Sequence, residues 1–231
     1  MYEVLEKLRD GRTIIIRAIR PDDRQRLSAH FKALSPQSVY FRFFGLKRDL
    51  TETNLDRFTR PDFASHIGLA AVVNEEGCER FSGVGRYIAK ANLDKESNSA
   101  EVAFAVLDAD QGHGIGTLLL EHLAQVARER GINRFTADAM AGNAKMLDVF
   151  EKSGFEVHES SEPGLIHVIF PIGAPRDSWK PINIAHAKPT QWMEDELCNT
   201  ARVRKIGWEI SCTMSKLLVR TSGHVSTMRS F

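Results

Sequence analysis

Apolar residues follow two different periods along most of the chain. Short runs rich in β-branched residues, such as Thr13–Ile19, predict strands, whereas apolar residues spaced three and four apart predict helices. The strands predicted in this way are 13–19, 66–74, 81–89, 100–107, 134–140, 155–158 and 165–170. We expect the first four of them to form a meander.

Five helices are expected around these strands. The first begins at Pro21, which suits an initial helical position, and carries an apolar stripe of Leu27, Phe31 and Leu34. The others are expected at 35–45, closed by Gly45; at 51–58, capped by Thr51; at 114–130, stopped by Gly131; and at 143–153, ended by Gly154. Together, these strands and helices predict an α/β (α+β) fold, with a mixed and mostly antiparallel sheet of six or seven strands flanked by helices.

The composition changes after residue 172. Four prolines fall within nineteen residues, from Pro171 to Pro189, and all three tryptophans follow residue 172. The pattern predicts a folded domain at 8–172, a proline-rich linker at 173–189 and a basic, tryptophan-containing extension at 190–231. For that extension we leave open packing on the domain, pairing in a homodimer and partial disorder.

Charge and cysteine content narrow the class of protein. The net charge is +1 over 231 residues, which indicates neither a nucleic-acid-binding surface nor a membrane-binding one. From residue 173 onward nine Lys or Arg face five Asp or Glu, so the preceding part is slightly acidic. The three cysteines have no metal-binding spacing, and no signal peptide or membrane span is visible, which favours a reduced, cytoplasmic protein.

A glycine-rich turn, 111–116, lies between the apolar strand 100–107 and an apolar helix. Such a turn directs backbone N–H groups and the positive end of a helix dipole at one point, which suits a phosphate or pyrophosphate. A nucleotide-binding Walker loop would need Gly-Lys-Ser/Thr, but Thr117 follows Gly116 directly. A dinucleotide-binding Gly-x-Gly-x-x-Gly would need glycine where Thr117 or Leu119 stands.

The turn instead matches Gln/Arg-x-x-Gly-x-Gly/Ala at each defined position. In this it resembles the pyrophosphate loop of the GCN5-related N-acetyltransferases (GNAT family). Two further segments, SPQSVYFRFFG at 35–45 and AEVAFAV at 100–106, resemble the acetyltransferase domain of bacterial protein lysine acetyltransferases. The resemblance implies the GNAT fold over roughly residues 8–172, acetyl-CoA as co-substrate and no metal.

The resemblance also implies which residues hold the cofactor. The loop would bind the pyrophosphate, the 103–105 backbone would bond the pantetheine arm, and a residue of the next helix would contact that arm. The residues carried over are Ala103, Phe104, Ala105, Gln111, Gly112, His113, Gly114, Ile115, Gly116 and Asn143. His113 either sits on the loop without contact or helps to neutralise phosphate.

Glu101 is the candidate general base. An amine acceptor is protonated at neutral pH and must lose a proton before it attacks a thioester, and a nearby carboxylate can accept that proton. The resemblance gives this role to the glutamate of the AEVAFAV string. We expect partial burial of Glu101 in its apolar strand, which would raise its pKa. The alternative is a glutamate that lies in solvent or pairs with an arginine such as Arg86.

The general acid is not specified. Many family members place a tyrosine seven residues after the asparagine, but this chain has Phe150 there. A water molecule, Tyr40 or Tyr87 remain alternatives, as does departure of the thiolate without help. Cys78 is not expected to be an acyl-carrying nucleophile, because no histidine is near it in the sequence.

The sequence thus predicts an N-acetyltransferase in which the amine attacks acetyl-CoA directly in a ternary complex. A protein lysine ε-amine is the expected acceptor. One alternative is a small-molecule amine or antibiotic N-acetyltransferase. The other is a non-catalytic acyl-CoA sensor, which would need the loop but no base.

Overall fold

The computed structural model describes residues 2–75, 77–89 and 98–173. The predicted linker at 173–189, apart from Gly173, and the predicted extension at 190–231 lie outside these residues. No helix within the described ranges is both long enough and apolar enough to cross a membrane.

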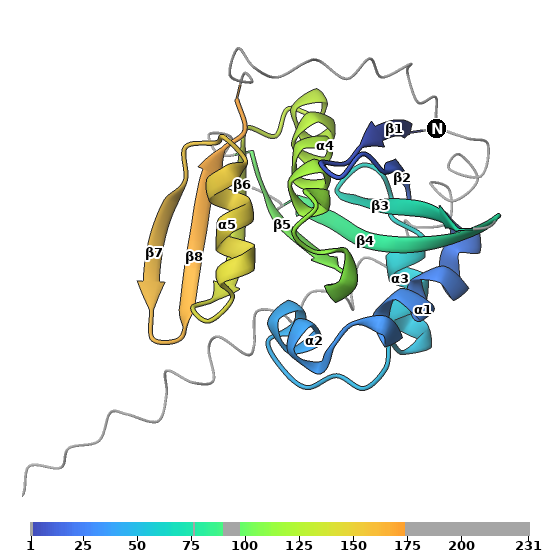
Figure 1. Ribbon diagram of the computed structural model, residues 1–231. Coiled ribbons are helices and arrows are strands. Elements are labelled where there is room, and N and C mark those ends of the chain that lie inside the picture. The colour runs from blue at the N-terminus through green and yellow to red at the C-terminus, as the bar shows by residue number, and fades with distance from the viewer. Residues whose placement is uncertain (1, 76, 90–97, 174–231) are drawn as a thin grey trace, which may run out of the picture. The chain divides into compact units, whose positions relative to one another are not determined.

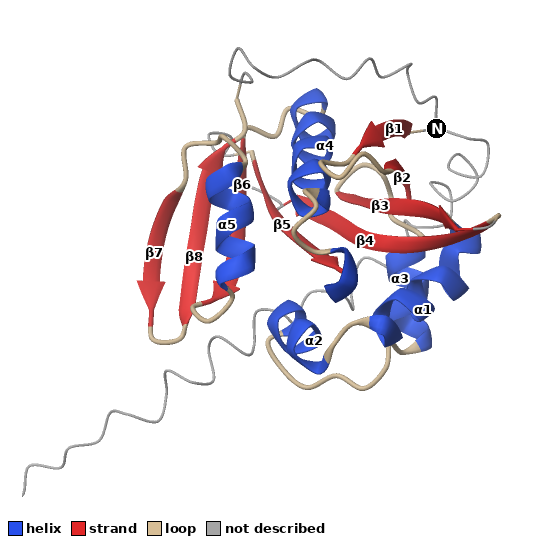
Figure 2. Ribbon diagram, viewed as in Figure 1, coloured by secondary structure: helices blue, strands red, loops and turns tan. Residues whose placement is uncertain are grey.

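One sheet of eight strands forms the centre of the fold, in the order β1-β2-β3-β4-β5-β6-β8-β7 (Figures 1 and 2). Neighbouring strands are antiparallel except β5 and β6, which are parallel. The strands are β1 (Glu3–Lys7), β2 (Thr13–Ala18), β3 (His66–Glu75), β4 (Cys78–Ala89), β5 (Ser99–Val106), β6 (Arg134–Met140), β7 (His158–Glu162) and β8 (Leu165–Pro171). The predicted meander is confirmed for β2 to β5.

The expected number of six or seven strands is corrected to eight, because β1 was not predicted. No residue of β1 is fully buried, so its sequence carries no apolar face; Tyr2 and Leu8, just outside it, are buried instead. Strand β7 lies three residues later than predicted. Its five residues are all exposed, whereas Phe155 and Val157, which suggested a strand, pack on the core before β7 begins.

Helices cover both faces of the sheet (Figure 2). The helices are η1 (Pro21–Asp23), α1 (Arg24–Ala33), α2 (Pro36–Phe43), α3 (Glu52–Thr59), η2 (Asp108–Asp110), α4 (Ile115–Glu129) and α5 (Ala144–Lys152). Residues of α4 and α5 share one apolar core with the sheet, and residues of α1 and α3 share a second one. The five predicted helices are confirmed, with ends shifted by one to three residues.

Helix α2 ends differently from the prediction. Phe44, not Gly45, adopts the left-handed conformation that ends the helix, with φ of 55°. A side chain with a Cβ is strained in this conformation, and such strain is often found at functional sites. Phe44 is 44% exposed and lines the cleft described below.

A buried ion pair fixes the turn from β2 to α1. Arg17 Nη1 lies 2.7 Å from Asp23 Oδ2, and Nη2 lies 2.8 Å from Oδ1, with both side chains almost completely buried. Burial acts to raise the pKa of Asp23. Hydrogen bonds from the Arg17 guanidinium and the Arg20 N–H outweigh burial and hold this pKa below its ordinary value.

We expect Asp23→Ala to lower the free energy of unfolding by about 3–5 kcal/mol at neutral pH, because the buried Arg17 charge loses its buried two-bond partner and keeps only Glu79, 3.3 Å from Nη2. Urea unfolding measures this difference. Since the folded-state pKa of Asp23 is depressed, its contribution is present above the unfolded-state pKa and is lost as pH falls through the folded one. Asp22→Ala, which removes an exposed neighbouring carboxylate, is the control; an equal effect of both variants would contradict this account.

Candidate active site

A cleft of about 400 Å³ opens between β5 and β6, where the two parallel strands separate. They pair only from Ser99–Glu101 to Arg134–Thr136, and the rest of β5 pairs with β4 alone. The cleft is lined by β5, by the 111–117 turn, by α5 and by the end of α2. Its lining residues include Arg9, Ser38, Phe41, Arg42, Phe44, Glu101, Ala103, Ala105, Asp108, Gln111, Gly112, Gly114, Asp138, Asn143, Lys145 and Lys152.

The glycine turn has the conformation that a phosphate cradle requires. Gly112 and Gly114 have φ of 82° and 93°, and Gly114 is the N-cap residue of α4. Turns of this kind gather backbone N–H groups into an anion-binding concavity at the positive end of a helix. A Cβ at Gly112 would meet no atom within 4 Å, so the space beside the turn is open. These features fit a pyrophosphate.

Hydrogen bonds at both ends hold this turn. Gln111 Nε2 donates to the Val106 carbonyl at 3.0 Å, and Lys145 Nζ on α5 donates to Gln111 Oε1 at 2.7 Å. Gly116 allows α4 to approach α5, because a Cβ there would lie 3.2 Å from a methyl group of Val149. The loop is therefore braced against both the preceding strand and α5.

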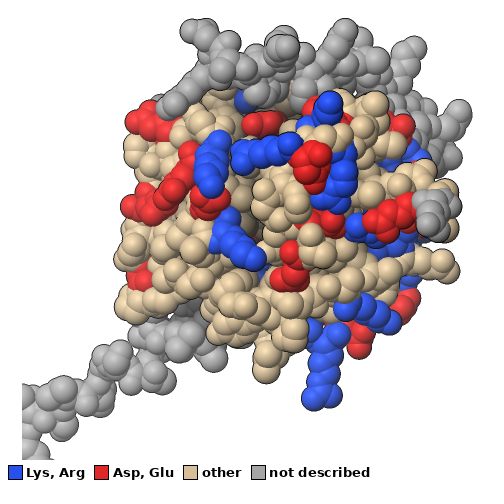
Figure 3. Space-filling model, viewed as in Figure 1, with Lys and Arg blue, Asp and Glu red and all other residues tan. Residues whose placement is uncertain are grey.

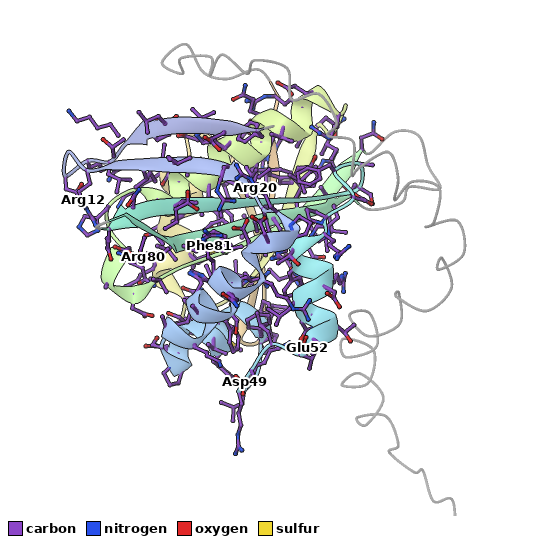
Figure 4. The ribbon with its side chains drawn as sticks, turned by 90° about the vertical axis from the view of Figure 1, so that its right-hand side faces the viewer. Arg12, Arg20, Asp49, Glu52, Arg80 and Phe81 are labelled. Carbon is purple, nitrogen blue, oxygen red and sulfur yellow. The ribbon has the colours of Figure 1, made fainter. Side chains whose placement is uncertain are left out.

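The buried carboxylate of Asp110 holds the start of the turn in place. It is 3% exposed and accepts hydrogen bonds from Arg80 Nη1 and Ser82 Oγ, both at 2.6 Å. Arg12, in the hairpin between β1 and β2, lies 3.4 Å from the same carboxylate. Figure 4 shows Arg12 and Arg80 at the same end of the sheet. Burial acts to raise the pKa of Asp110, but these donors hold it below its ordinary value.

The other residues predicted to bind cofactor divide into three groups. Ala103 and Ala105 are half-buried and line the cleft. The side chains of Phe104 and Ile115 belong to the core, so only their backbones are available to a ligand. His113 does not line the cleft; its Nδ1 lies 3.2 Å from the Asp110 carbonyl and its Nε2 lies 3.6 Å from Asp10.

Asn143 lines the cleft from the N-terminus of α5. Its Oδ1 accepts a hydrogen bond from the Met146 N–H at 3.3 Å, which caps that helix. Capping uses the carboxamide oxygen, so the Nδ2 group is left to donate elsewhere.

Glu101 lies in the cleft on the face of β5 away from α4. Its neighbours Ala100 and Val102 are buried in the α4 core, whereas Glu101 is exposed. The expected partial burial is therefore wrong, because Glu101 lies on the face of β5 that α4 does not cover and lines the cleft there. Within the described part of the chain, the Glu101 carboxylate forms no hydrogen bond or ion pair, and in particular none with Arg86.

No tyrosine lines the cleft, although all three in the chain are described. Tyr87 is completely buried in the α4 core, and Tyr40 is 40% exposed on α2 outside the cleft lining. Phe150 is also completely buried, in contact with Phe104 and Phe170. Neither tyrosine that sequence analysis considered as general acid is placed to reach the cleft. Cys78 is exposed on the turn before β4 and does not line it.

Asp108 joins α2 to the strand that carries Glu101. Its carboxylate accepts hydrogen bonds from the N–H and hydroxyl of Ser35, both at 2.9 Å, and from the Ser38 hydroxyl at 2.8 Å. Burial acts to raise the pKa of Asp108, but these donors hold it below its ordinary value. Asp108 therefore positions the helix that brings Phe41 and Arg42 into the cleft.

We expect Asp108→Ala to raise the KM for the acceptor several-fold and to leave acetyl-CoA affinity nearly unchanged, because α2 loses its attachment while the glycine turn keeps its own hydrogen bonds. We also expect a loss of about 1–3 kcal/mol in stability. Steady-state kinetics and thermal unfolding measure both effects. Asp49→Ala is the control, since Asp49 is an exposed acid beyond the same helix (Figure 4). A larger loss of cofactor affinity than of acceptor affinity would contradict this role.

The cleft residues that sequence analysis missed include Arg42, Asp138 and Lys145. Arg42 lies four residues after Ser38 on α2, so helical spacing alone places both on one face. Asp138 alternates in β6 with buried Ala137 and Ala139, which marks its side of the strand. The spacing in the sequence therefore indicates the face of α2 and of β6 on which Arg42 and Asp138 lie. It does not indicate that these two faces border one cleft.

Comparisons with known proteins agree with this geometry. Residues 37–155 match the Acetyltransferase (GNAT) family. An acetyltransferase of Pseudomonas aeruginosa is 33% identical over 151 residues, which cover 65% of this chain and 79% of that protein. Acetyltransferase Pat of Mycolicibacterium smegmatis is 30% identical over 151 residues, covering 64% of this chain and only 43% of that protein. The crystal structure of the GNAT domain of S. lividans PAT superposes with a TM-score of 0.66 at 40% identity, covering 73% of this chain and 96% of that domain.

Proposed function

This chain belongs to the GNAT acetyltransferase family and is an acyl-CoA-dependent acetyltransferase; we propose that it transfers an acetyl group from acetyl-CoA to the ε-amine of protein lysines. The observation that carries the proposal is one cleft that holds both the glycine turn and an unpaired glutamate. The SPQSVYFRFFG and AEVAFAV segments support the lysine acceptor, as does the likeness to the S. lividans PAT domain.

The chain's own groups would bind the cofactor along the separated edge of β5. The backbone of 111–116 would hold the pyrophosphate, with His113 supporting the turn through its contacts to Asp110 and Asp10 rather than through a phosphate contact. The backbone of Ala103 to Ala105 is free of a β6 partner and would bond the pantetheine arm. The Asn143 Nδ2 group would donate to the same arm. Bound acetyl-CoA supplies the thioester that the amine attacks.

Glu101 would act as the general base. Its carboxylate is exposed in the cleft and has no competing partner within the described residues, so it is available to accept a proton from the acceptor ammonium, directly or through a water molecule. No tyrosine lines the cleft, so the CoA thiolate would be protonated by water or would leave without help. The amine and the thioester would react directly, with no covalent enzyme intermediate.

Incubation of the protein with labelled acetyl-CoA, a protein extract and a panel of small amines tests the acceptor. Label on protein lysines is the expected result. Label only on small amines would replace the proposal by small-molecule acetylation. Binding of acetyl-CoA without any transfer would favour a sensor.

A cytoplasmic location, which agrees with the reduced-protein pattern of three cysteines, is part of the proposal.

A further inference from the structure

The cleft is lined by both acidic and basic side chains, and one of its cations, Arg42, lacks a carboxylate partner among the described residues. Arg42 on α2 is half-buried and lines the cleft beside Glu101. Its guanidinium forms no hydrogen bond or ion pair with any residue that the structure describes, and lies 5.1 Å from the centre of the Phe43 ring. Burial lowers the pKa of Arg42, and the Glu101 carboxylate is the opposite charge that acts against this.

A second arginine, Arg86, lies on strand β4 of the sheet. Arg86 on β4 is 6% exposed, packs its guanidinium 3.8 Å from the centre of the Phe58 ring and leaves Nη1 without a hydrogen-bond partner. Pairing of Arg86 with Ala103 places it on the same face of the sheet as Glu101. Burial, together with the positive charges of Arg42 and Arg57, lowers the pKa of Arg86 well below its ordinary value.

Lys47 is the third of these cations. Its Nζ atom donates a hydrogen bond to Asn54 Oδ1 at 2.8 Å, which is not a carboxylate, and lies 4.9 Å from the centre of the Phe43 ring. Burial together with the charge of Arg42 lowers the pKa of Lys47. We call Arg42, Lys47 and Arg86 the basic cluster. Buried cations normally have carboxylate partners, because an unpaired charge away from water is costly. On the face shown in Figure 3, basic and acidic side chains are interspersed.

Exposed apolar side chains lie close to Arg42 and Lys47 in the sequence. Tyr40, Phe44 and Leu46 are 40%, 44% and 91% exposed, and they lie in α2 and the segment directly after it. Phe44 lines the cleft itself. Exposed aromatic and aliphatic groups beside cations are the composition of a protein-binding surface rather than of a pocket for a small polar amine.

We propose that Arg42, the member of the basic cluster that lines the cleft, binds a carboxylate of the acceptor, so that the preferred acceptor is a protein lysine with an aspartate or glutamate close to it in space or sequence. Lys47 and Arg86 do not line the cleft and add positive charge beside Arg42. The apolar rim of Tyr40, Phe44 and Leu46 contacts the same acceptor segment. The acceptor carboxylate supplies the negative charge that the cluster lacks and leaves Glu101 free to accept a proton. This inference rests on the proposed lysine acetylation and specifies its substrate class.

Matched peptides test the proposal. Three lysine peptides of equal length carry Asp and Glu, Asn and Gln, or Lys and Arg around one acceptor lysine, and free amino acids and diamines serve as small acceptors. We expect kcat/KM for the acidic peptide to exceed that for the neutral one about tenfold or more, the worth of a charge-assisted hydrogen bond. The preference should shrink as salt is raised. Equal kcat/KM for acidic and neutral peptides would overturn the inference.

Variants assign the preference to the cluster. Arg42→Gln should abolish the preference for the acidic over the neutral peptide, and Arg42→Lys should keep most of it. Lys7→Gln, which removes an exposed positive charge from β1, is the control and should keep all of it. Acetyl-CoA binding, measured by calorimetry, shows that each variant is folded. Persistence of the preference in Arg42→Gln would contradict the assignment.

Arg86→Met provides a second, independent readout. Because the methionine packs on Phe58 without an unpaired charge, we expect the melting temperature to rise by a few degrees while the preference for acidic peptides falls. A lower melting temperature with an unchanged preference would show that Arg86 is merely structural.

Failure of the inference is distinguishable from failure of the proposed function. Equal transfer to all peptides removes only the former, whereas transfer to small amines alone removes both.

Discussion

Gly114→Glu is expected to abolish acetyl-CoA binding. Gly114 has φ of 93° and begins α4, so a side chain there distorts the turn, and a carboxylate is placed where two phosphates are to be held. Like-charge repulsion close to the N-terminus of α4 removes the attraction on which the binding depends. Calorimetry should detect no binding, and acetyl-CoA should no longer raise the melting temperature.

Gly164→Glu is the matched control for this experiment. Gly164 has φ of 83° in the turn between β7 and β8, with no atom within 4 Å of a Cβ built there. The two variants share the backbone strain of about 1–2 kcal/mol, but only one changes the cleft. We expect Gly164→Glu to bind acetyl-CoA normally. If acetyl-CoA still protects Gly114→Glu against heat, the glycine turn does not hold the cofactor.

Glu101→Gln is expected to lower turnover by about 10²-fold or more, the usual contribution of a general base. The substitution keeps the size of the side chain and removes only its ability to accept a proton. Because Glu101 makes no hydrogen bond or ion pair with a described residue, the change should leave stability and acetyl-CoA affinity nearly unaltered. Initial rates at saturating acetyl-CoA measure the loss.

Glu159→Gln removes an exposed carboxylate from β7 and is the control for charge alone. It should retain the rate of the unmodified protein. A Glu101→Gln variant that retains this rate too would remove Glu101 from the mechanism. A variant that loses acetyl-CoA affinity as much as it loses rate would show instead that Glu101 contributes to binding.

Local features of the site were predictable from the sequence because single residues dictate them. Alternate glycines at 112 and 114 indicate left-handed backbone, and both have positive φ. Alternation along β5 places Ala100 and Val102 in the core and Glu101 on the other face. These inferences need only the two-residue period of a strand and the conformational freedom of glycine.

Features that depend on how distant elements meet were not predictable in this way. Strands β1 and β7 have no buried face, so they leave no apolar pattern to recognise. The cleft beside Glu101 exists because β5 and β6 separate after three paired positions, which no local pattern encodes. Asp108 and Ser35 are far apart in the sequence, and their contact exists only because α2 packs beside the end of β5.

The most direct test of the central claim is the rate at which labelled acetyl groups reach protein lysines, measured in parallel with acetyl-CoA affinity for the unmodified protein, Glu101→Gln and Gly114→Glu. We expect the unmodified protein to bind acetyl-CoA and to transfer the label. Glu101→Gln should bind acetyl-CoA but transfer the label at least about 10²-fold more slowly, and Gly114→Glu should neither bind nor transfer. Binding by the unmodified protein without transfer to any lysine, or equal transfer by Glu101→Gln, would contradict it.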